Sequence, residues 1–404
     1  MKILIIHAHN SNRGDEAAVK AMVDELLLIY PDSEIVISNN GFTPYPRMDK
    51  RVKQIKRFPV LENKLSQLDF LIAAYTGGKV AFTSYGREFI RQIKDADIVL
   101  HAPGGPSIGD IYEKAEMLYL LRLNMVRRLG KPYVFYAPSM GPFKNETRNK
   151  LRKEILNNAA AIVVRDPISF NYVKDFVPNK DILLALDSAF QHDIDMDYNA
   201  GVLDGYSELK EFLKKHSKCI GVTITDLKWH PTHKNNSNIA EAIDDTFNDF
   251  IKKKTEEGYG IVFVPQLYGS SNDSTLMKKY CLNDNCFIVS DKEDKFDAYF
   301  QQYIISKLHA VVGMRYHSNI FSAKMGVPFI SISYEQKMKG FMLNMNLQEY
   351  CIELQELSKG MLQEKFDLLL RTHSEYKKTL IKKHDLMKDA AYKTTLVVKD
   401  ILDS

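Results

Sequence analysis

The sequence predicts an α/β protein built from two doubly wound, Rossmann-like domains that face each other across a cleft. Apolar runs typical of buried parallel strands alternate with stretches whose apolar residues recur at helical spacing. This alternation breaks once, in an acidic and turn-rich segment at 191–215, and restarts with CIGVTIT at 219–225. A chain of 404 residues is also longer than one hydrophobic core usually serves. Ligands of such folds bind outside the carboxyl ends of the strands, so functional residues are expected there.

The first half of the chain begins with the strand-like run KILIIHA at 2–8, a polar turn and the helical stretch AAVKAMVDELLLIY. A second helical stretch is expected at 84–94. Further apolar runs, each followed by polar or glycine-containing turns, lie at 34–38, 96–105, 131–139, 160–166 and 182–190. This order predicts a parallel sheet covered by helices, in an N-terminal domain that spans 1–200.

The second half repeats the pattern after the break. Helical stretches are expected near 238–256 and 297–307. The apolar runs between them lie at 219–225, 260–266, 286–290, 310–314 and 328–333. We therefore expect a C-terminal α/β domain at 216–345. Residues 346–404 are helical and rich in lysine, and they could pack back on the N-terminal domain.

Composition and charge exclude several classes of protein. With 45% hydrophobic and 26% charged residues, the chain is an ordinary globular protein rather than a disordered or fibrous one. A net charge of +4 is too small for a typical nucleic-acid-binding protein but permits an anionic ligand. The chain has no signal-peptide pattern, no apolar run long enough to span a membrane, and only four sparse cysteines. A cytoplasmic location and no nucleic-acid partner are therefore expected.

The first strand run is followed by NSNRGDEA, which holds Asn12, Gly14, Asp15 and Glu16. A glycine in such a turn lets backbone N–H groups approach a ligand, and the following helix N-terminus favours an anion. The two acids could accept protons from sugar hydroxyls. Helix capping is the alternative that spacing alone favours, because Asp and Glu are common in first turns.

The run at 96–105 leads into HAPGGPSIGD, which places Gly104, Gly105 and Ser107 after a predicted strand. These glycines suit close backbone approach by a bound group, yet a Gly-Gly-Pro turn is equally routine between a strand and a helix. The pattern is neither G-x-G-x-x-G nor a P-loop. It therefore supports neither a nicotinamide dinucleotide nor Walker-type ATP binding.

Two further strand ends carry charged residues. Arg165 follows AAIVV and presents a planar donor fork suited to phosphate or carboxylate. An ion pair with the adjacent Asp166 is an equal alternative. Asp187, with Ser188 and Gln191, follows the next apolar run and could line the cleft, although turn formation is the favoured role.

The run at 310–314 leads directly into Arg315, His317 and Ser318. The helix that begins near Ser318 would turn its N-terminal amides toward the guanidinium and imidazole groups. Convergence of these groups suits a phosphate ester. A functional role for His317 is therefore favoured over a structural one.

Two other groups of basic residues have weaker functional interpretations. His230 and His233 are three residues apart, but Pro231 breaks any helix that would place both on one face. We therefore expect a solvated or acceptor-facing loop there, and no metal site. The lysine pairs near 252–254 and 382–383 are expected to be solvated helix faces, with contact to an anionic membrane surface as the alternative.

The chain resembles the polysaccharide pyruvyl transferase family from the first strand to about residue 342. Four segments carry this resemblance: NRGDEA, GGPSIGD with YAPSMGPF, VVRDPISF with LDSAF, and GMRYHSNIFSAKMGVPFISISYEQKMKGF. The last segment is the most specific, because Arg-x-His, a small-residue helix, Gly-x-Pro, Tyr334 and Lys337 occur in order. The chain departs from the family pattern at Pro106, where a third glycine is common, and at Tyr316, where leucine is usual.

The resemblance implies a fold like that of the GT-B glycosyltransferases, phosphoenolpyruvate as donor, and a sugar of a growing surface polysaccharide as acceptor. It places phosphoenolpyruvate on Arg165, Arg315 and His317, with the N-terminal domain as the acceptor side and the C-terminal domain as the donor side. His317 is the expected acid or phosphate-stabilising residue, and Asp15 or Glu16 the expected proton acceptor. Phosphoenolpyruvate is a co-substrate, and no cofactor or metal is needed.

The expected product is a cyclic pyruvate ketal of the sugar, released with inorganic phosphate. A polyprenyl-diphosphate-linked repeat unit is one form of the acceptor, and the protein would then work at the inner face of the cell membrane. Two alternatives stay open: a GT-B glycosyltransferase with a nucleotide-sugar donor, and a non-catalytic carbohydrate-binding protein of a polysaccharide assembly complex. The sequence does not decide the acceptor sugar or the oligomeric state.

Overall fold

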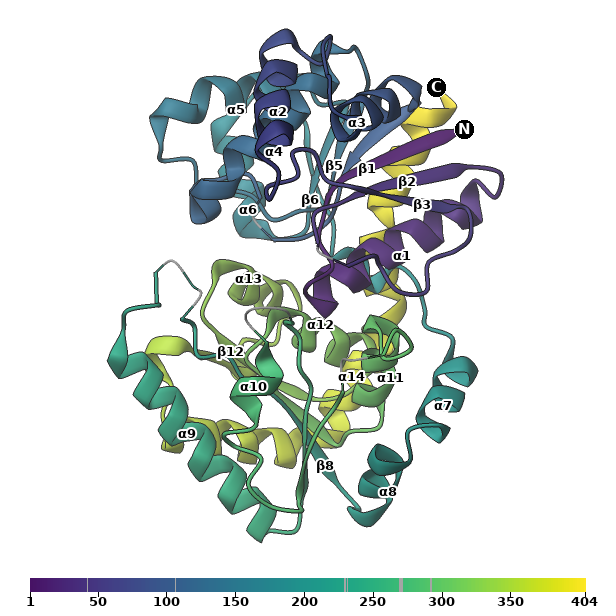
Figure 1. Ribbon diagram of the computed structural model, residues 1–404. Coiled ribbons are helices and arrows are strands. Elements are labelled where there is room, and N and C mark those ends of the chain that lie inside the picture. Colours follow the sequence, from purple (N-terminus) through teal and green to yellow (C-terminus); the bar gives the residue numbers. More distant parts are fainter. Residues whose placement is uncertain (42, 106, 229, 231, 269–271, 291–292) are drawn as a thin grey trace. The chain divides into compact units, whose positions relative to one another are not determined.

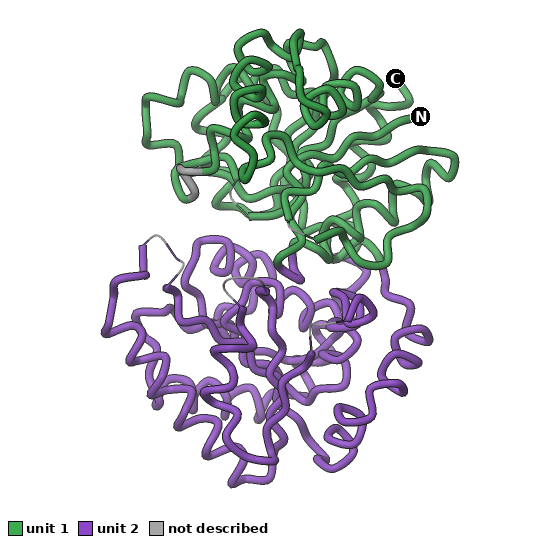
Figure 2. The backbone as a smooth tube through the Cα atoms, viewed as in Figure 1, with its two compact units in different colours: residues 1–11, 15–192, 388–404 green, residues 12–14, 193–387 purple. Residues whose placement is uncertain are grey.

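The computed structural model (Figure 1) describes the chain except residues 42, 106, 229, 231, 269–271 and 291–292, and it describes no side chains at 112–114. Pro106 and Pro231, which two sequence interpretations use, lie outside the described residues. The chain divides into two compact units (Figure 2). Unit 1 comprises 1–11, 15–192 and 388–404, and unit 2 comprises 12–14 and 193–387.

Unit 1 contains, among its described residues, a parallel sheet of seven strands in the order β3-β2-β1-β4-β5-β6-β7. The strands are β1 (Lys2–Ala8), β2 (Glu34–Asn39), β3 (Val52–Lys56), β4 (Ile98–His101), β5 (Tyr133–Tyr136), β6 (Ala161–Val164) and β7 (Ile182–Leu184). In the register of the central strands, Ile3 lies opposite Ile35 on one side and Ile98 on the other. Central strands are continuous apolar runs because both faces of a parallel sheet are buried.

Helices cover both faces of the unit 1 sheet (Figure 1). One layer holds α2 (Lys64–Thr76), α3 (Ser84–Asp95), α4 (Glu113–Arg128), α5 (Glu146–Asn158) and α6 (Pro167–Phe176), and the other holds α1 (Arg13–Ile29) with the end of α14 (Lys359–Asp403). Leu4 and Ile6 of β1 pack into the first layer, whereas Ile3 and Ile5 pack into the second. This follows from the period of two in a strand. Short 3-10 helices lie at Asp110–Tyr112 and Ser188–Phe190.

Unit 2 contains, within the part of it that the structure describes, a six-stranded parallel sheet in the order β10-β9-β8-β11-β12-β13. Its strands are β8 (Cys219–Thr223), β9 (Gly260–Phe263), β10 (Cys286–Ile288), β11 (Ala310–Gly313), β12 (Phe329–Ser333) and β13 (Cys351–Glu353). Its helices are α7 (Met196–Asp204), α8 (Ser207–Lys215), α9 (Ser237–Glu256), α10 (Asp273–Met277), α11 (Ala298–Ser306), α12 (Tyr316–Lys324), α13 (Gln336–Asn344), the first part of α14, and 3-10 turns at Gln348–Tyr350 and Leu354–Glu356. In both sheets the strand order reverses direction beside the first strand, which is the arrangement that creates a ligand-binding switch point.

The last helix, α14, belongs to unit 2 through Met387 and to unit 1 from Lys388. Within unit 1, the backbone N–H of Leu186 donates to the carbonyl of Ala390 at 3.3 Å, and Val398 joins the second core layer. None of the helices in the described ranges combines the length and apolar composition that a membrane crossing needs.

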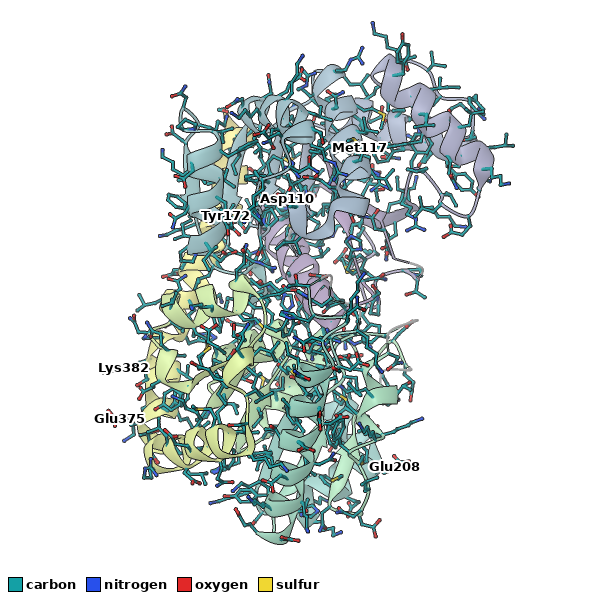
Figure 3. All side chains as sticks on the ribbon, turned by 90° about the vertical axis from the view of Figure 1, so that its left-hand side faces the viewer. Asp110, Met117, Tyr172, Glu208, Glu375 and Lys382 are labelled. Atoms are coloured by element: carbon teal, nitrogen blue, oxygen red, sulfur yellow. The ribbon has the colours of Figure 1, made fainter. Side chains whose placement is uncertain are left out.

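The prediction of solvated lysines is confirmed for Lys252 and Lys253 but is wrong for Lys254. Lys254 is buried, and its ammonium donates to Glu257 at 2.9 Å, because α9 turns this side chain inward rather than toward solvent. Lys383 donates to the carbonyl of Met345 at 2.7 Å, whereas Lys382 lies at the surface of α14 (Figure 3).

The predicted α/β class with two parallel sheets is confirmed, and the differences lie in short strands. Residues 346–404 were expected to be helical, but they also contain β13, which pairs with β12. The sequence analysis did not predict β3, whose residues VKQIK contain two lysines and a glutamine. An edge strand has a neighbour on one side only, so it lacks the apolar signal of a central strand. The run at 182–190 is a strand only as far as Leu184, and its end forms a 3-10 turn at Ser188–Phe190.

Candidate functional site

Arg315 lies at the carboxyl edge of the unit 2 sheet, two residues beyond β11 and directly before α12. Its side chain is buried and forms a two-point ion pair with Asp273 at the start of α10, where Nε donates to Oδ2 at 3.2 Å and Nη2 to Oδ1. Burial lowers the pKa of Arg315, but Asp273 and Tyr334 together outweigh burial and raise it. A positive charge is thus fixed at the strand end.

Thr223 at the end of β8 fixes the backbone around this arginine. Its Oγ1 accepts hydrogen bonds from the N–H groups of Met314 and Arg315 at 3.1 and 3.2 Å. Ser318 Oγ lies 2.8 Å from Thr223 Oγ1 and donates to the Arg315 carbonyl at 2.7 Å. The predicted site residue Ser318 is therefore a buried anchor for the first turn of α12.

The loop Asn12–Gly14 belongs to unit 2 and lies against His317. The N–H of Arg13 donates to the carbonyl of Gln266 at 2.9 Å, and the N–H of Gly14 donates to Asn12 Oδ1 at 2.7 Å. Asn12 thus caps α1, and Asp15 and Glu16 follow in its first turn. A Cβ on Gly14 would lie only 1.8 Å from Nδ1 of His317. Of the predicted site residues, Gly14 and His317 are therefore brought into direct contact.

Tyr334 and Lys337 flank a buried carboxylate, Glu335, beyond the end of β12. Glu335 accepts from Lys337 Nζ at 2.7 Å, and its Oε1 lies 3.2 Å from Nε2 of His230. Burial alone would raise the pKa of Glu335, but Lys337 and His230 lower it to about 2. The expectation of a solvated loop at His230 is therefore wrong, because this histidine is buried against Glu335. A cavity of about 190 Å³ adjoins this cluster, lined by Ser333, Tyr334, Glu335, Gln336, Lys339, Glu353 and Gln355.

Arg165 lies at the carboxyl edge of the unit 1 sheet, after β6. It is buried, with Nη1 at 2.5 Å from Asp187 Oδ2 and Nε donating to Ser139 Oγ at 2.9 Å. The Asp187 carboxylate also accepts from the N–H of Ala189 at 3.0 Å. Asp187 therefore stabilises the turn that follows it and also pairs with the arginine. The adjacent Asp166 instead caps α6, where Oδ1 accepts from the N–H of Ser169 at 2.8 Å.

The other predicted residues of unit 1 gather at the ends of β1 and β4. Glu16 is fully buried, whereas Asp15 is half-buried, and a Cβ on Gly104 would lie 3.2 Å from its Oδ1. A Cβ on Gly105 would meet nothing within 4 Å. Ser107 Oγ lies 2.8 Å from Nε2 of His101.

Four aromatic residues of unit 1 were missed by the sequence analysis: His7, His9, His101 and Tyr119. The rings of His101 and Tyr119 meet His7 edge-on, with centroids 4.6 and 4.5 Å away. Nε2 of His9 lies 2.8 Å from the Tyr119 hydroxyl. The sequence signal that could have found this group is a pair of histidines at alternate positions, His7 and His9, at the end of an otherwise apolar strand run.

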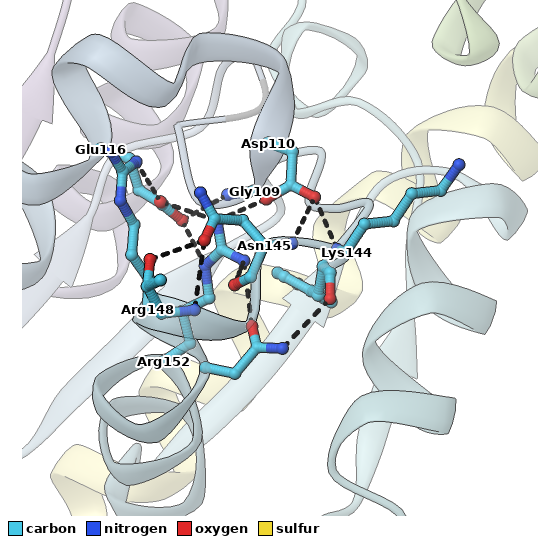
Figure 4. Close-up of polar contacts among 10 residues, drawn as sticks. Gly109, Asp110, Glu116, Lys144, Asn145, Arg148 and Arg152 are labelled. Atoms are coloured by element: carbon cyan, nitrogen blue, oxygen red, sulfur yellow. Dashed lines mark hydrogen bonds and ion pairs between the residues drawn. The ribbon is translucent and has the colours of Figure 1, made fainter.

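The last residue of the glycine-rich segment, Asp110, has a structural role (Figure 4). It accepts from the N–H groups of Lys144 and Asn145 at 2.5 and 3.2 Å and from Arg152 Nη2 at 2.7 Å. Arg152 also pairs with the fully buried Glu116 at 2.8 Å. This network holds α4 and α5 together rather than presenting charge at the edge of the sheet.

Unit 2 thus holds the predicted residues Arg315, His317, Ser318, Tyr334 and Lys337 together with Asn12 and Gly14, and unit 1 holds the others. The meeting of Arg165 with Arg315 and His317 at one phosphoenolpyruvate molecule stays a prediction.

Comparisons with known proteins identify what the chain is similar to. The family model described as polysaccharide pyruvyl transferase matches residues 12–336. The amylovoran biosynthesis protein AmsJ from Erwinia amylovora is 24% identical over 407 residues, which cover 93% of each chain. Among solved structures, UDP-GlcNAc 2-epimerase from Neisseria meningitidis, bound to UDP-GlcNAc, has a TM-score of 0.62 at 12% identity, with both chains fully covered.

Two glycosyltransferases have the same fold. ADP-heptose lipopolysaccharide heptosyltransferase II from E. coli has a TM-score of 0.50 at 13% identity, covering 93% of this chain and 100% of that one. UDP-glucose:anthocyanidin 3-O-glucosyltransferase in complex with UDP has a TM-score of 0.54 at 13% identity, covering 100% and 98%. These likenesses confirm the predicted GT-B-like fold.

We predict that Gly14→Ala destabilises unit 2. A methyl group there overlaps the His317 ring, and overpacking of a buried contact costs about 1–3 kcal/mol, despite the better helix propensity of alanine. The matched control is Gly201→Ala in α7, where a Cβ meets nothing within 4 Å and alanine should stabilise by about 0.5–1 kcal/mol. Thermal unfolding measures both, and a Gly14→Ala variant as stable as the wild type contradicts the contact.

We also predict that Glu335→Gln destabilises the protein in a pH-dependent way. The pKa of Glu335 is about 2 in the folded state, below its value of about 4.5 when unfolded, so ionisation contributes roughly 3 kcal/mol above pH 5. This contribution is lost as the pH falls toward 2. The difference in melting temperature between wild type and variant should therefore shrink on acidification.

The control for this effect is Glu353→Gln, which removes an exposed carboxylate paired with Lys339 and should cost less than about 1 kcal/mol. Equal losses for the two variants, or a Glu335→Gln effect that is the same at pH 3 and pH 7, would show that the Glu335 carboxylate is not stabilised as described.

Proposed function

The chain belongs to the polysaccharide pyruvyl transferase family, and from this premise we propose that it transfers the pyruvyl group of phosphoenolpyruvate to a sugar. The acceptor would be a sugar of a surface polysaccharide or of its lipid-linked repeat unit. Its reaction would form a cyclic pyruvate ketal and release inorganic phosphate. The similarity to an amylovoran biosynthesis protein supports a role in polysaccharide modification.

The observation that carries the proposal is a buried arginine at the carboxyl edge of each sheet. Asp187 fixes Arg165, and Asp273 fixes Arg315. Phosphoenolpyruvate carries a carboxylate and a phosphate, and each is a group that guanidinium binds through parallel N–H donors. A guanidinium has five N–H donors, more than one carboxylate can accept, so an ion-paired arginine can still hold an anion. Each such bond contributes roughly 1.5–3 kcal/mol.

The reaction needs one proton at carbon 3 of phosphoenolpyruvate and two proton acceptors for the sugar. Protonation of the methylene carbon makes carbon 2 electrophilic, and one hydroxyl oxygen bonds to it as its proton leaves. The bond from carbon 2 to the phosphate oxygen then breaks, and a second hydroxyl closes the ketal. Of the two protons that the hydroxyls lose, one replaces the proton taken up by carbon 3 and one leaves with phosphate.

His317 is our candidate for the acid or for the residue that stabilises the departing phosphate. It follows Arg315 in the first turn of α12, where backbone N–H groups and the helix dipole favour an anion. The absence of a side chain at Gly14 leaves space for the imidazole of His317. Between the two candidate bases, Asp15 is half-buried and Glu16 is fully buried, so Asp15 is the better candidate to meet an acceptor hydroxyl.

A second candidate function is glycosyl transfer from a nucleotide-sugar. The observation that favours it is that solved proteins of this fold bind UDP or UDP-GlcNAc. Fold likeness at 12% to 13% identity says little about the reaction, because one fold hosts many chemistries.

A location in the cytoplasm and a polyprenyl-diphosphate-linked acceptor are further parts of the pyruvyl transfer proposal.

We predict phosphate release that depends on both phosphoenolpyruvate and a saccharide, from a panel of galactosyl, glucosyl and mannosyl acceptors. The product should have the mass of acceptor plus phosphoenolpyruvate minus phosphoric acid. Arg165→Lys and Arg315→Lys keep the charge but lose the planar fork, so the KM for phosphoenolpyruvate should rise about tenfold or more. His317→Ala should lower kcat roughly 100-fold or more.

The control is Arg152→Lys, an equally buried and ion-paired arginine within unit 1, which should leave the KM for phosphoenolpyruvate unchanged. Normal donor saturation in both arginine variants excludes Arg165 and Arg315 from phosphoenolpyruvate binding. Calorimetric binding of a UDP-sugar without binding of phosphoenolpyruvate favours glycosyl transfer instead.

A further inference from the structure

The histidine cluster of unit 1, defined as His7, His9, His101 and Tyr119, has features that a structural role leaves unexplained. His7 is 3% exposed, and neither of its ring nitrogens has a hydrogen-bond partner in the described part of the chain. Its φ of 65° places a bulky residue in the left-handed region, at the point where the register of β1 and β2 shifts. Such backbone strain is typical of functional sites.

The hydrogen bonds of the cluster fix which ring nitrogens donate. The amide Nδ2 of Asn40 approaches Nε2 of His9 at 3.3 Å, and an amide nitrogen only donates, so this Nε2 accepts. Nδ1 of the neutral ring therefore carries the proton. No described residue accepts a hydrogen bond from it. In His101, Nδ1 faces the carbonyl of Ala102 at 2.8 Å and must donate, so Nε2 accepts from Ser107 Oγ.

The electrostatic surroundings keep these rings neutral. Burial lowers the pKa of His9, the charge of Asp15 raises it by a smaller amount, and Arg122 and Arg57 lower it further. Burial also lowers the pKa of His101, to about 4. Arg122, the buried cation of this region, donates to the carbonyl of Phe58 and to Asn40 Oδ1 at 2.6 and 3.0 Å. Neutral groups that both donate and accept match hydroxyls better than they match an anion.

We propose that the histidine cluster is the binding site for two hydroxyls of the acceptor saccharide, one of which it presents to Asp15. This inference rests on the proposed function and deepens it. Nδ1–H of His9 donates to one hydroxyl oxygen, and the Tyr119 and Ser107 oxygens accept from the sugar. Gly104 presents no side chain beside Asp15, and a Cβ on Gly105 would meet nothing within 4 Å. Asp15 accepts the proton of the hydroxyl that attacks carbon 2, and His7 is a positioning residue behind them.

The test compares Tyr119→Phe and His9→Ala with the wild type in steady-state kinetics. Loss of one bond to a sugar hydroxyl should raise the acceptor KM roughly 5- to 100-fold, while the KM for phosphoenolpyruvate stays unchanged. The matched control is Tyr133→Phe, a buried tyrosine of the same unit whose hydroxyl donates to the carbonyl of Ile155 and which should leave both constants unchanged. Thermal unfolding checks that each variant is folded.

The outcomes separate this inference from the proposed function. If the wild type releases phosphate with a saccharide and both variants keep its acceptor KM, the cluster is not the acceptor site although pyruvyl transfer stands. If a variant raises the KM for phosphoenolpyruvate instead, the cluster serves the donor and the inference is overturned. If no saccharide supports phosphate release by the wild type, the proposed function fails and the inference fails with it.

A second, independent observation concerns the outer side of α2 in unit 1. Leu65, Leu68, Leu71 and Tyr75 are between 51% and 87% exposed. With the half-buried Ile72 they occupy one stripe of the helix, opposite the buried residues Ser66, Asp69, Phe70, Ala73 and Ala74. Further exposed apolar residues flank the helix in sequence: Leu61, Val80 and Phe82. This set of eight is the α2 face below.

The charges around the α2 face are mostly positive. Lys64 and Lys79 are exposed and form no ion pair with a described residue, and Arg128 is exposed beside the carbonyl of Tyr75. The only acid within α2, Asp69, is buried and accepts from the N–H groups of Phe82 and Thr83. Exposed leucines and an aromatic ring with a cationic rim are complementary to the interface of an anionic bilayer.

We infer that the α2 face binds the surface of an anionic membrane. Purified full-length protein should co-sediment with vesicles of phosphatidylcholine and phosphatidylglycerol, and less with phosphatidylcholine alone. The double variant Leu65→Ser, Leu68→Ser should bind at least about tenfold more weakly, because both side chains lose apolar burial in the interface. The control is Leu282→Ser, which changes a leucine of unit 2 that is even more exposed, at 76%, and should leave vesicle binding unchanged.

Absence of sedimentation with anionic vesicles overturns this inference, as does a double variant that binds like the wild type. Equal binding to neutral vesicles rejects the electrostatic part of it. If light scattering shows a wild-type dimer that the double variant loses, a second copy of the chain covers the face and the membrane assignment is wrong.

Discussion

Burial of Arg165 and Arg315, on which the candidate site depends, requires that each guanidinium is paired with a carboxylate. A lone buried arginine would be expensive, because the protein interior solvates it poorly, whereas a hydrogen-bonded carboxylate restores most of what is lost. Arg165 with Asp187 and Arg315 with Asp273 are two solutions of this kind, one at the carboxyl edge of each sheet. Pairing also fixes each guanidinium in one orientation. Under the proposed function, each arginine would therefore need no reorientation to bind an anionic group.

Small residues determine how closely the polar groups of each unit approach. In unit 2, only the missing side chain of Gly14 allows the imidazole of His317 to lie against the start of α1. In unit 1, Gly104 leaves Asp15 a place beside the end of β4. Polar chemistry at a strand end therefore needs glycine as much as it needs charged residues, because a Cβ would occupy the same space. This accounts for glycines within two of the segments that resemble the family.

Fold and family contribute different information about this protein. The fold is shared with epimerases and glycosyltransferases whose structures hold UDP or UDP-GlcNAc, so it does not select a donor. Family membership places the chain among polysaccharide pyruvyl transferases, and phosphoenolpyruvate as the donor is our proposal. The neutral histidine cluster of unit 1 differs chemically from both arginine sites. We propose that this difference reflects a division of labour, with cations for the donor and neutral donor–acceptor groups for sugar hydroxyls.

The sequence by itself determined the α/β class, the order of the central strands' apolar runs, and the position of Arg165, Arg315 and His317 just beyond strands. These features follow from local periodicity, since a strand buried on both faces must be apolar and must end where polar residues begin. Only the tertiary structure decided which carboxylates neutralise the arginines, that His230 is buried against Glu335, and that three histidines and Tyr119 meet at the ends of β1 and β4. Such partners are distant along the chain. Their meeting depends on which strands become neighbours in a sheet, and no local pattern of residues encodes that choice.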